Sequence, residues 1–322
     1  MWSLQFRMWF LLAVFFAIIY MIVTMVGVTL GVTNFYFYLG FSLFLMFLQY
    51  LISPKIVEWS MGVRYVDEGE SPALHQMVGE LARKAGIPKP KVGISRMPIP
   101  NAFAFGRGAS DGRICVTQGI LSLLEENELR AVLGHEISHL KYRDVLTITL
   151  LSVVPMILYR IYWHTMWFGG SRDRRNGANA AVVGLAAFLF YFITNLLVLY
   201  ASRLREYFAD RGAILLGNRP EHLATALYKL VYGSARADKE TLREAEGLKA
   251  FFLNDPSRAY NEIRELSQLD LDKSGTIDPV ELQRLQSKTL RLSFADRALE
   301  VLSTHPNMLK RIRQLSAYEA RG

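Results

Sequence analysis

The chain has 322 residues, of which 51% are hydrophobic and 20% charged, with a formal net charge of +8. This mixture predicts concentrated apolar segments beside an ordinary polar domain. The basic residues are scattered, and neither a Gly-rich phosphate loop nor a basic run interleaved with aromatics is present, so we expect no nucleic-acid partner. The single cysteine, Cys115, excludes an intramolecular disulfide and a cysteine-ligated zinc site, and it favours a reducing compartment.

Two uncharged apolar runs open the chain, at residues 8–32 and 35–53. The first is long enough for the hydrocarbon core of a bilayer, which needs about 20 apolar residues in a helix, and the second is close to that length. The first run is also too long for the apolar part of a signal peptide, lacks a clear cleavage site and leads directly into the second. We therefore predict that residues 8–53 form an N-terminal transmembrane hairpin.

A polar segment, residues 60–144, follows this hairpin. Residues 63–87 carry apolar side chains at helical spacing and end at Gly86, which predicts a helix. Three short alternating stretches come next: KVGISR (91–96), NAFAFG (101–106) and RICVTQ (113–118). Because the turn GASDG joins the last two, we predict a small antiparallel sheet.

Two further apolar runs, residues 145–168 and 178–201, predict a second membrane hairpin over residues 145–201. Pro155, Arg160 and His164 interrupt the former run. It either spans the bilayer, with Arg160 reaching the far interface, or only dips into it.

Positive charges near the apolar runs predict the orientation. One side of the membrane would carry seven of them and the other side three (Arg7, Lys55, Arg64, Lys141, Arg143, Arg203 and Arg205; Arg172, Arg174 and Arg175). This bias predicts a multi-pass protein of the plasma membrane, with both termini and the polar segments facing the cytoplasm.

The sequence HEISH lies on a predicted helix that begins in the acidic stretch before residue 129. Residues four apart share a helix face, so His135 and His139 can offer imidazole nitrogens to one metal ion. Glu136, next to the first histidine, is directed at a water molecule on that ion. The apolar flanks indicate a core-packed helix, where two unpaired histidines would be costly, although an incidental surface pair is the alternative. The motif therefore predicts a zinc site.

A catalytic zinc ion needs a third protein ligand and an open position. After the fourth apolar run, LREYFADRGAILLG predicts a helix with Glu206 and Asp210 four residues apart. Glu206 can supply a carboxylate to the zinc, and Asp210 can accept the free N–H of a ligand histidine. From spacing alone, an acidic pair on a solvated helix explains the two residues equally well.

Four stretches together resemble the HtpX-type membrane metallopeptidases, which are distant relatives of the CAAX prenyl proteases: NAFAFG, VTQGILSLLEENELRAVLGHEISH, REYFAD and STHPNMLKRI. The resemblance covers nearly all of the chain except about 235–295. It implies a mainly α-helical integral membrane protein with four apolar runs, in which the small antiparallel sheet lies beside a zincin-type catalytic helix bundle. Residues 60–144 and 203–322 would form the two parts of its catalytic domain.

The resemblance also implies the roles of individual residues. His135, His139 and Glu206 would hold one Zn²⁺ per chain, Glu136 would act as general base, and Asp210 would orient a histidine. His305 is implied as a hydrogen-bond donor to the oxyanion. The alternative is that it is only a structural residue at the start of the last helix. Asn101 is implied to lie near the edge along which an extended substrate binds.

The implied activity is that of a membrane-bound zinc endopeptidase (EC 3.4.24 type) acting on misfolded or damaged membrane proteins. Two other functions stay open: a calcium-responsive membrane binding protein with a structural zinc site, and a processing protease of the CAAX type. Four apolar runs are fewer than we expect of the CAAX type. The partners predicted are polypeptide substrates and the lipid bilayer, and the sequence does not predict an oligomeric state.

Residues 270–281, DLDKSGTIDPVE, have the spacing of an EF-hand calcium loop. Six residues occupy the coordinating positions: Asp270, Asp272, Ser274, Thr276, Asp278 and Glu281. Gly275 stands at the sharp turn, and with predicted flanking helices the insertion covers about 258–293. The pattern predicts a Ca²⁺ site, with an ion-free acidic loop between helices as the alternative.

Overall fold

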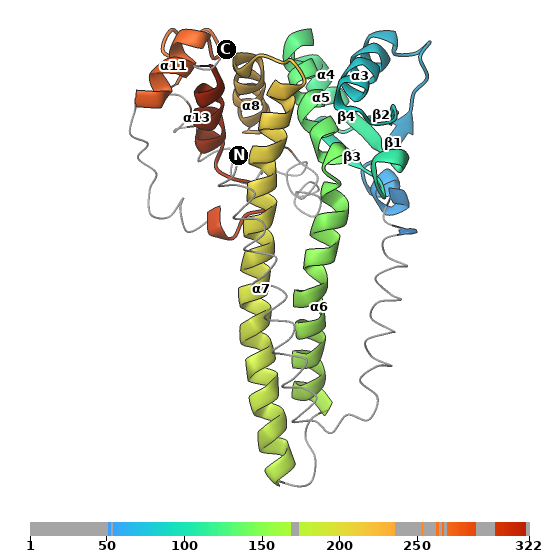
Figure 1. The fold of residues 1–322 in the computed structure, drawn as a ribbon, viewed down its shortest axis with the longest axis vertical. Helices are drawn as coiled ribbons and strands as arrows, with labels where there is room; N and C mark the ends of the chain where they lie inside the picture. Colours follow the sequence, from blue (N-terminus) through green and yellow to red (C-terminus); the bar gives the residue numbers. More distant parts are fainter. Residues whose placement is uncertain are drawn as a thin grey trace. The chain divides into compact units, whose positions relative to one another are not determined.

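The computed structural model describes most of the chain after the first 50 residues (51–52, 54–168, 174–235, 253, 262–263, 266, 269–287 and 300–319) (Figure 1). The predicted hairpin at residues 8–53 lies almost wholly outside the described residues. The chain divides into two compact units. Unit 1 comprises Met1–Ile52 and Leu146–Leu204, and unit 2 comprises Ser53–Val145 and Arg205–Gly322.

The described part of unit 1 consists of helical residues from α6 (Asp144–Phe168) and α7 (Arg174–Leu215). Leu151 and Leu158 of α6 share a buried cluster with Ala187 and Val198 of α7, so the two helices pack side by side (Figure 1). Among the described residues one helix, Ala181–Leu215, is long and apolar enough to cross a membrane. The prediction of four spans is not confirmed: the first two runs lie outside the described residues, and the crossing by residues 145–168 stays a prediction.

The apolar side chains of α7 are largely exposed, which is unusual for a protein surface in water. Val182, Leu185 and Leu189 are 63%, 65% and 56% exposed, and Phe192 is 50% exposed. The polar side chain of Thr194 is buried and donates a hydrogen bond of 2.7 Å to the carbonyl of Phe190 on the same helix. An apolar exterior with internally satisfied polar groups is typical of a helix surrounded by lipid.

Unit 2 contains a mixed four-stranded sheet with the strand order β1-β2-β4-β3. The strands are β1 (Val63–Tyr65), β2 (Lys91–Ser95), β3 (Ala102–Phe105) and β4 (Arg113–Thr117). β1–β2 and β3–β4 are antiparallel pairs, but β2 and β4 run parallel. The prediction of a purely antiparallel sheet is therefore wrong.

The connection between β2 and β3 does not form a hairpin. It contains Pro98 and Pro100, which lack backbone N–H groups and do not extend a strand ladder. β3 pairs with β4 and not with β2, and β4 lies between them. β4 is antiparallel to β3 on one side. On its other side it pairs with β2, and these two strands run in the same direction.

Alternation along the strands separates two cores. Ile114 and Val116 of β4 join the larger core, together with α3 (Pro72–Ala85) and α5 (Glu126–Lys141). Cys115, between them, points to the opposite face and joins a smaller core with Phe103 and Phe105 of β3. Cys115 has no exposed surface.

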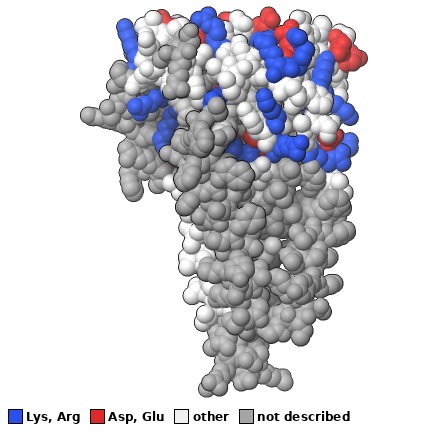
Figure 2. Space-filling view, viewed as in Figure 1, with Lys and Arg blue, Asp and Glu red and all other residues white. Residues whose placement is uncertain are grey.

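The remaining helices of unit 2 surround the larger core: α4 (Gln118–Leu123), α8 (Pro220–Ala235), α11 (Pro279–Ser287) and α13 (Met308–Glu319). The helix predicted at residues 63–87 begins only at Pro72, because residues 63–65 form β1 instead. It ends as predicted at Gly86, whose φ of 71° is left-handed. Lys, Arg, Asp and Glu crowd the surface of this unit (Figure 2).

Candidate metal centre

The helix α5 carries HEISH and begins at a reciprocal cap. The Glu125 side chain accepts from the backbone of Glu128, and the Glu128 carboxylate accepts from Glu125 N at 2.9 Å. This capping box fixes the start of the helix, and Lys229 of α8 pairs with Glu128 at 2.7 Å. Because α5 is buried along most of its length, its motif faces protein, not solvent.

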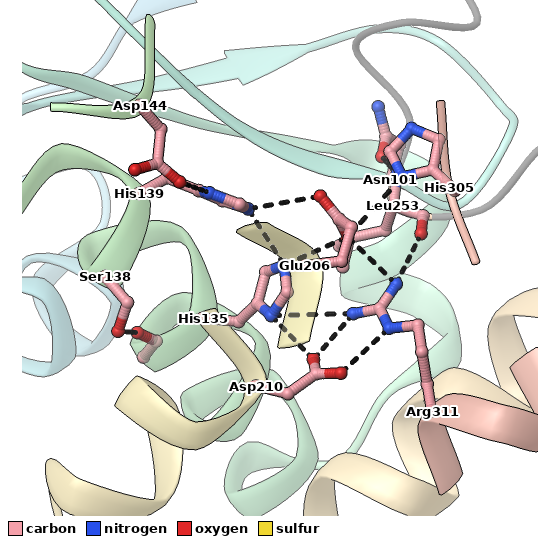
Figure 3. Close-up of polar contacts among 11 residues, drawn as sticks. Asn101, His135, Ser138, His139, Asp144, Glu206, Asp210, Leu253, His305 and Arg311 are labelled. Carbon is pink, nitrogen blue, oxygen red and sulfur yellow. Dashed lines mark hydrogen bonds and ion pairs between the residues drawn. The ribbon is translucent and has the colours of Figure 1, made fainter. Parts of the chain in front are cut away.

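Two glycines let α5 approach the last part of α7 closely. A Cβ atom at Gly212 would lie 2.2 Å from Oγ of Ser138, and a Cβ atom at Gly134 would lie 2.5 Å from Nδ2 of Asn218. Any larger residue would force the helices apart. The close approach brings Glu206 and Asp210 of α7 against the histidines of α5 (Figure 3).

Three donor atoms converge at the centre of this contact. The Nε2 atoms of His135 and His139 are 3.0 Å apart, and each lies 3.6 Å from a carboxylate oxygen of Glu206. Ligands about 2.0–2.1 Å from a tetrahedral zinc ion are separated by about 3.3 Å. Two imidazoles and a carboxylate at these separations fit a catalytic zinc site in both chemistry and spacing. Glu136 lies in the same cluster as the two histidines.

A carboxylate holds the other nitrogen of each histidine ring. Nδ1 of His135 lies 2.8 Å from Asp210, and Nδ1 of His139 lies 2.5 Å from Asp144. Asp144 is itself paired with Arg205. Both rings are therefore fixed with Nε2 directed at the centre, as metal-binding histidines require. Asp210 was anticipated from its spacing to Glu206, whereas no local pattern marked Asp144 as a partner.

Arg311 of α13 joins the two carboxylates of α7. Its guanidinium, which has no exposed surface, binds Asp210 at 2.7 and 2.9 Å and lies 3.1 Å from Glu206. It also donates a hydrogen bond of 2.9 Å to the carbonyl of Leu253. Sequence reasoning missed this residue, although it belongs to the quoted stretch STHPNMLKRI. Arg311 neutralises negative charge that would otherwise be buried behind the histidines.

The electrostatic surroundings of the HEISH side chains differ. Burial raises the pKa of Glu136 above its usual range, although both histidines and a hydrogen bond from the backbone of Ala104 act against it. Burial and the nearby His135 lower the pKa of His139. Burial acts in the same direction on His135, but Asp210 and Glu206 outweigh it and raise the pKa of that ring. Asp210 and Glu206 thus favour the protonated form of His135, whereas burial favours the neutral form of His139.

The other two predicted site residues lie at the margin of this cluster. Nδ1 of His305 is 3.4 Å from Glu206, and neither ring nitrogen has a hydrogen-bond partner among the described residues. Asn101, just before β3, is buried and accepts a hydrogen bond of 3.0 Å from the backbone of Leu253. His305 therefore lies beside the donor set, whereas Asn101 binds the backbone of Leu253, whose carbonyl binds Arg311.

The predicted calcium loop forms a second, separate group of acidic residues. Ligand oxygens of Asp270, Asp272 and Glu281 lie within 4.8 Å of one another. Asp278 accepts a hydrogen bond of 2.7 Å from Glu281 N at the start of α11. The hydroxyls of Ser274 and Thr276, also predicted as ligands, lie 2.9 Å from each other.

Known proteins are similar to this chain in sequence. The profile of Peptidase family M48 matches residues 68–319. The "Protease HtpX homolog" of Methanothermobacter thermautotrophicus is 53% identical over 252 residues, which cover 77% of this chain and 94% of that protein. A protein of the same description from Moorella thermoacetica is 41% identical over 68% of this chain and 74% of its own length.

A solved structure is similar in fold. The crystal structure of S. mikatae Ste24p superposes with a TM-score of 0.52, covering 98% of this chain and 67% of that one. Its sequence identity is 17%, so the similarity concerns the architecture alone.

Proposed function

The chain belongs to peptidase family M48, with HtpX-type proteases among its relatives, and on that premise we propose that it is a membrane-bound zinc endopeptidase. One observation carries the proposal. His135, His139 and Glu206 present two imidazoles and a carboxylate at separations of 3.0 and 3.6 Å, with Glu136 in the same cluster. The spacing suits one Zn²⁺ per chain.

Zinc bound by these three side chains would supply Lewis acidity to the scissile carbonyl and to the attacking water. Glu136 would accept a proton as the water oxygen forms its bond to the carbonyl carbon. It would then return that proton to the amine nitrogen as the C–N bond breaks. The raised pKa of Glu136 suits its role as a base, because a carboxylate with a pKa nearer neutrality accepts a proton from water more readily.

The free edge of the sheet offers a place for the substrate. Among the described strands β3 pairs with β4 alone, and the backbone of its Ala104 contacts Glu136. A peptide added alongside β3 in extended form would thus pass the general base. In this arrangement Asn101 sets the start of the edge strand. His305, whose ring nitrogens are unsatisfied, would donate to the oxyanion.

The membrane location rests on the exposed apolar face of α7 and on the candidate span. We propose hairpins at residues 8–53 and 145–201, and a catalytic domain formed by residues 60–144 and 203–322 that faces the cytoplasm of a multi-pass plasma-membrane protein. Substrates in this position would be misfolded or damaged membrane proteins. They need only an extended segment that can reach the sheet edge.

Casein hydrolysis by the purified full-length protein tests the peptidase mechanism. A zinc chelator should abolish cleavage, and Glu136→Gln should lower the rate by at least about 100-fold while zinc stays bound. Glu126→Gln, an exposed change on the same helix, should cleave at the normal rate and serves as the matched control. Normal cleavage by Glu136→Gln would refute the mechanism, whereas absence of cleavage by the unchanged protein would favour a structural zinc site in a calcium-responsive binding protein.

A further inference from the structure

The loop of residues 270–281, here called the acidic loop, is not used by the proposed peptidase mechanism. We propose that it binds one hard divalent cation of the size of Ca²⁺, at a site separate from the metal centre and anchored to α8. The proposal does not depend on peptidase activity. It combines a twelve-residue ligand pattern with a structure that assembles the pattern, and no described lysine or arginine pairs with its buried carboxylates.

The ligand atoms are assembled as such an ion requires. Oxygens of Asp270, Asp272 and Glu281, at positions one, three and twelve of the loop, lie within 4.8 Å of one another. Because Ca²⁺ binds oxygen at about 2.4 Å, ligands on opposite sides of the ion are about 4.8 Å apart. The group has no nitrogen or sulfur donor, so it suits calcium in preference to zinc.

The charge of this group suits a bound cation. Asp270 and Glu281 are only 8% and 6% exposed. They accept hydrogen bonds from neutral groups: backbone amides of the loop and the hydroxyl of Tyr228. Within the described part of the chain, no Lys or Arg forms an ion pair with either carboxylate or with Asp272. Buried carboxylates this close together repel unless a cation lies between them.

The turn in the middle of the loop keeps these oxygens together. Gly275, at position six, has a φ of 80°, a conformation that favours glycine. Its N–H donates to Asp270 at 2.9 Å, and the N–H of Ser274 donates to the same carboxylate at 2.9 Å. The backbone therefore folds around position one of the ligand pattern.

Helix α8 supplies the support that a second loop gives in paired EF-hands. In such pairs the residue at position eight bonds to its counterpart in the partner loop. Here that residue is Ile277, and the Thr225 hydroxyl accepts from its N–H at 2.9 Å and donates to its carbonyl at 3.2 Å. One turn further along α8, Tyr228 donates to Asp270 at 3.0 Å. A single loop is thus held in register without a partner.

The acidic loop is also continuous with the core around the metal centre. Ile277 and Leu282, within and just after the loop, are almost fully buried in the larger core. The helix α11 that leaves the loop packs against α13, which carries Arg311. Cation binding would therefore stabilise the helices that surround Arg311, not an isolated surface turn.

Calorimetry and thermal unfolding test the site on the full-length, zinc-loaded protein in detergent, in buffer stripped of calcium over a chelating resin. Titration with CaCl₂ should show one ion per chain, and the unfolding midpoint should rise with calcium and then saturate. Glu281→Gln keeps the side-chain shape but removes one charge and one strong ligand. It should weaken calcium binding by at least about tenfold, since ligand charge sets the affinity of such loops.

Glu68→Gln makes the same chemical change on an exposed residue outside the loop and should bind calcium as the unchanged protein does. The unfolding midpoint of Glu281→Gln without calcium shows whether that variant is folded. If Glu281→Gln does not fold, Asp272→Asn, a change at an exposed position of the same site, takes its place. Absence of calcium binding at millimolar concentration, or equal binding by the loop variants, would overturn the proposal. Neither measurement needs peptidase activity, so failure here leaves the proposed peptidase function untouched.

Discussion

At the metal centre each histidine ring has one nitrogen bound to a carboxylate and one directed at the donor cluster. Asp210 comes from the same helix as Glu206, whereas Asp144 lies five residues after His139, the last residue of HEISH. One carboxylate thus comes from the first residue of α6 and the other from the last part of α7. They fix which nitrogen is free to bind metal.

The Asp144 contact gives the first prediction. Asp144→Asn should weaken zinc binding by about 10–100-fold, because an amide orients the His139 ring less strongly than a carboxylate does. Competition with a chelating dye measures the affinity. Asp67→Asn, at an exposed position, is the matched control, and equal zinc affinity in both variants would contradict a role for Asp144.

Arg311 gives the second prediction. Arg311→Met should lower stability by about 3–5 kcal/mol, because it leaves the buried carboxylates of Asp210 and Glu206 without their arginine partner. The stability of Arg311→Lys should lie between those of the unchanged protein and Arg311→Met, since lysine keeps the charge but not the paired hydrogen bonds to Asp210. Thermal unfolding measures both. Arg313→Met lies on the exposed face of the same helix, and a loss as large there would show that the effect is not specific.

At the scale of elements, the close contact of α5 with α7 depends on glycine. Gly212→Ala should push the helices apart, because its methyl group would lie 2.2 Å from Oγ of Ser138. We expect weaker zinc binding and a lower unfolding midpoint. Adding Ser138→Gly to the same chain should restore part of the loss. Gly79→Ala on α3 has only ordinary contacts, with a nearest atom at 3.7 Å, and should be harmless.

Local sequence patterns predicted the elements that carry the chemistry but not all of their pairings. Spacing alone placed His135 and His139 on one helix face, and the family resemblance was needed to prefer Glu206 as the third ligand. Turn signals could not predict the parallel pairing of β2 with β4, because they identify only strands that follow each other directly in the sequence. Arg311 escaped notice because its partner Asp210 lies about a hundred residues earlier. Such contacts depend on tertiary packing, which no local pattern records.

At the scale of the whole molecule, α7 carries exposed apolar side chains along one part of its length and residues of the candidate metal centre along another. Its exposed apolar residues between Val182 and Ile193 fall in unit 1, and Glu206 and Asp210 fall in unit 2. Leu189→Asp should reduce membrane integration, because an acidic residue at the centre of a span costs about 3 kcal/mol. The fraction retained in membranes after an alkaline wash measures this. Leu189→Val should behave as the unchanged protein, and full retention of the Asp variant would argue against a lipid contact there.

Cys115 has a practical consequence for studies of motion in this protein. It is the only thiol, it has no exposed surface, and burial raises its pKa to about 12. The native protein should therefore resist maleimide at neutral pH, because thiolate is the reactive form. A cysteine introduced on the surface would then accept a spin label or fluorophore alone, with the wild-type thiol left in place. Pairs of such labels would report distances across each unit without background.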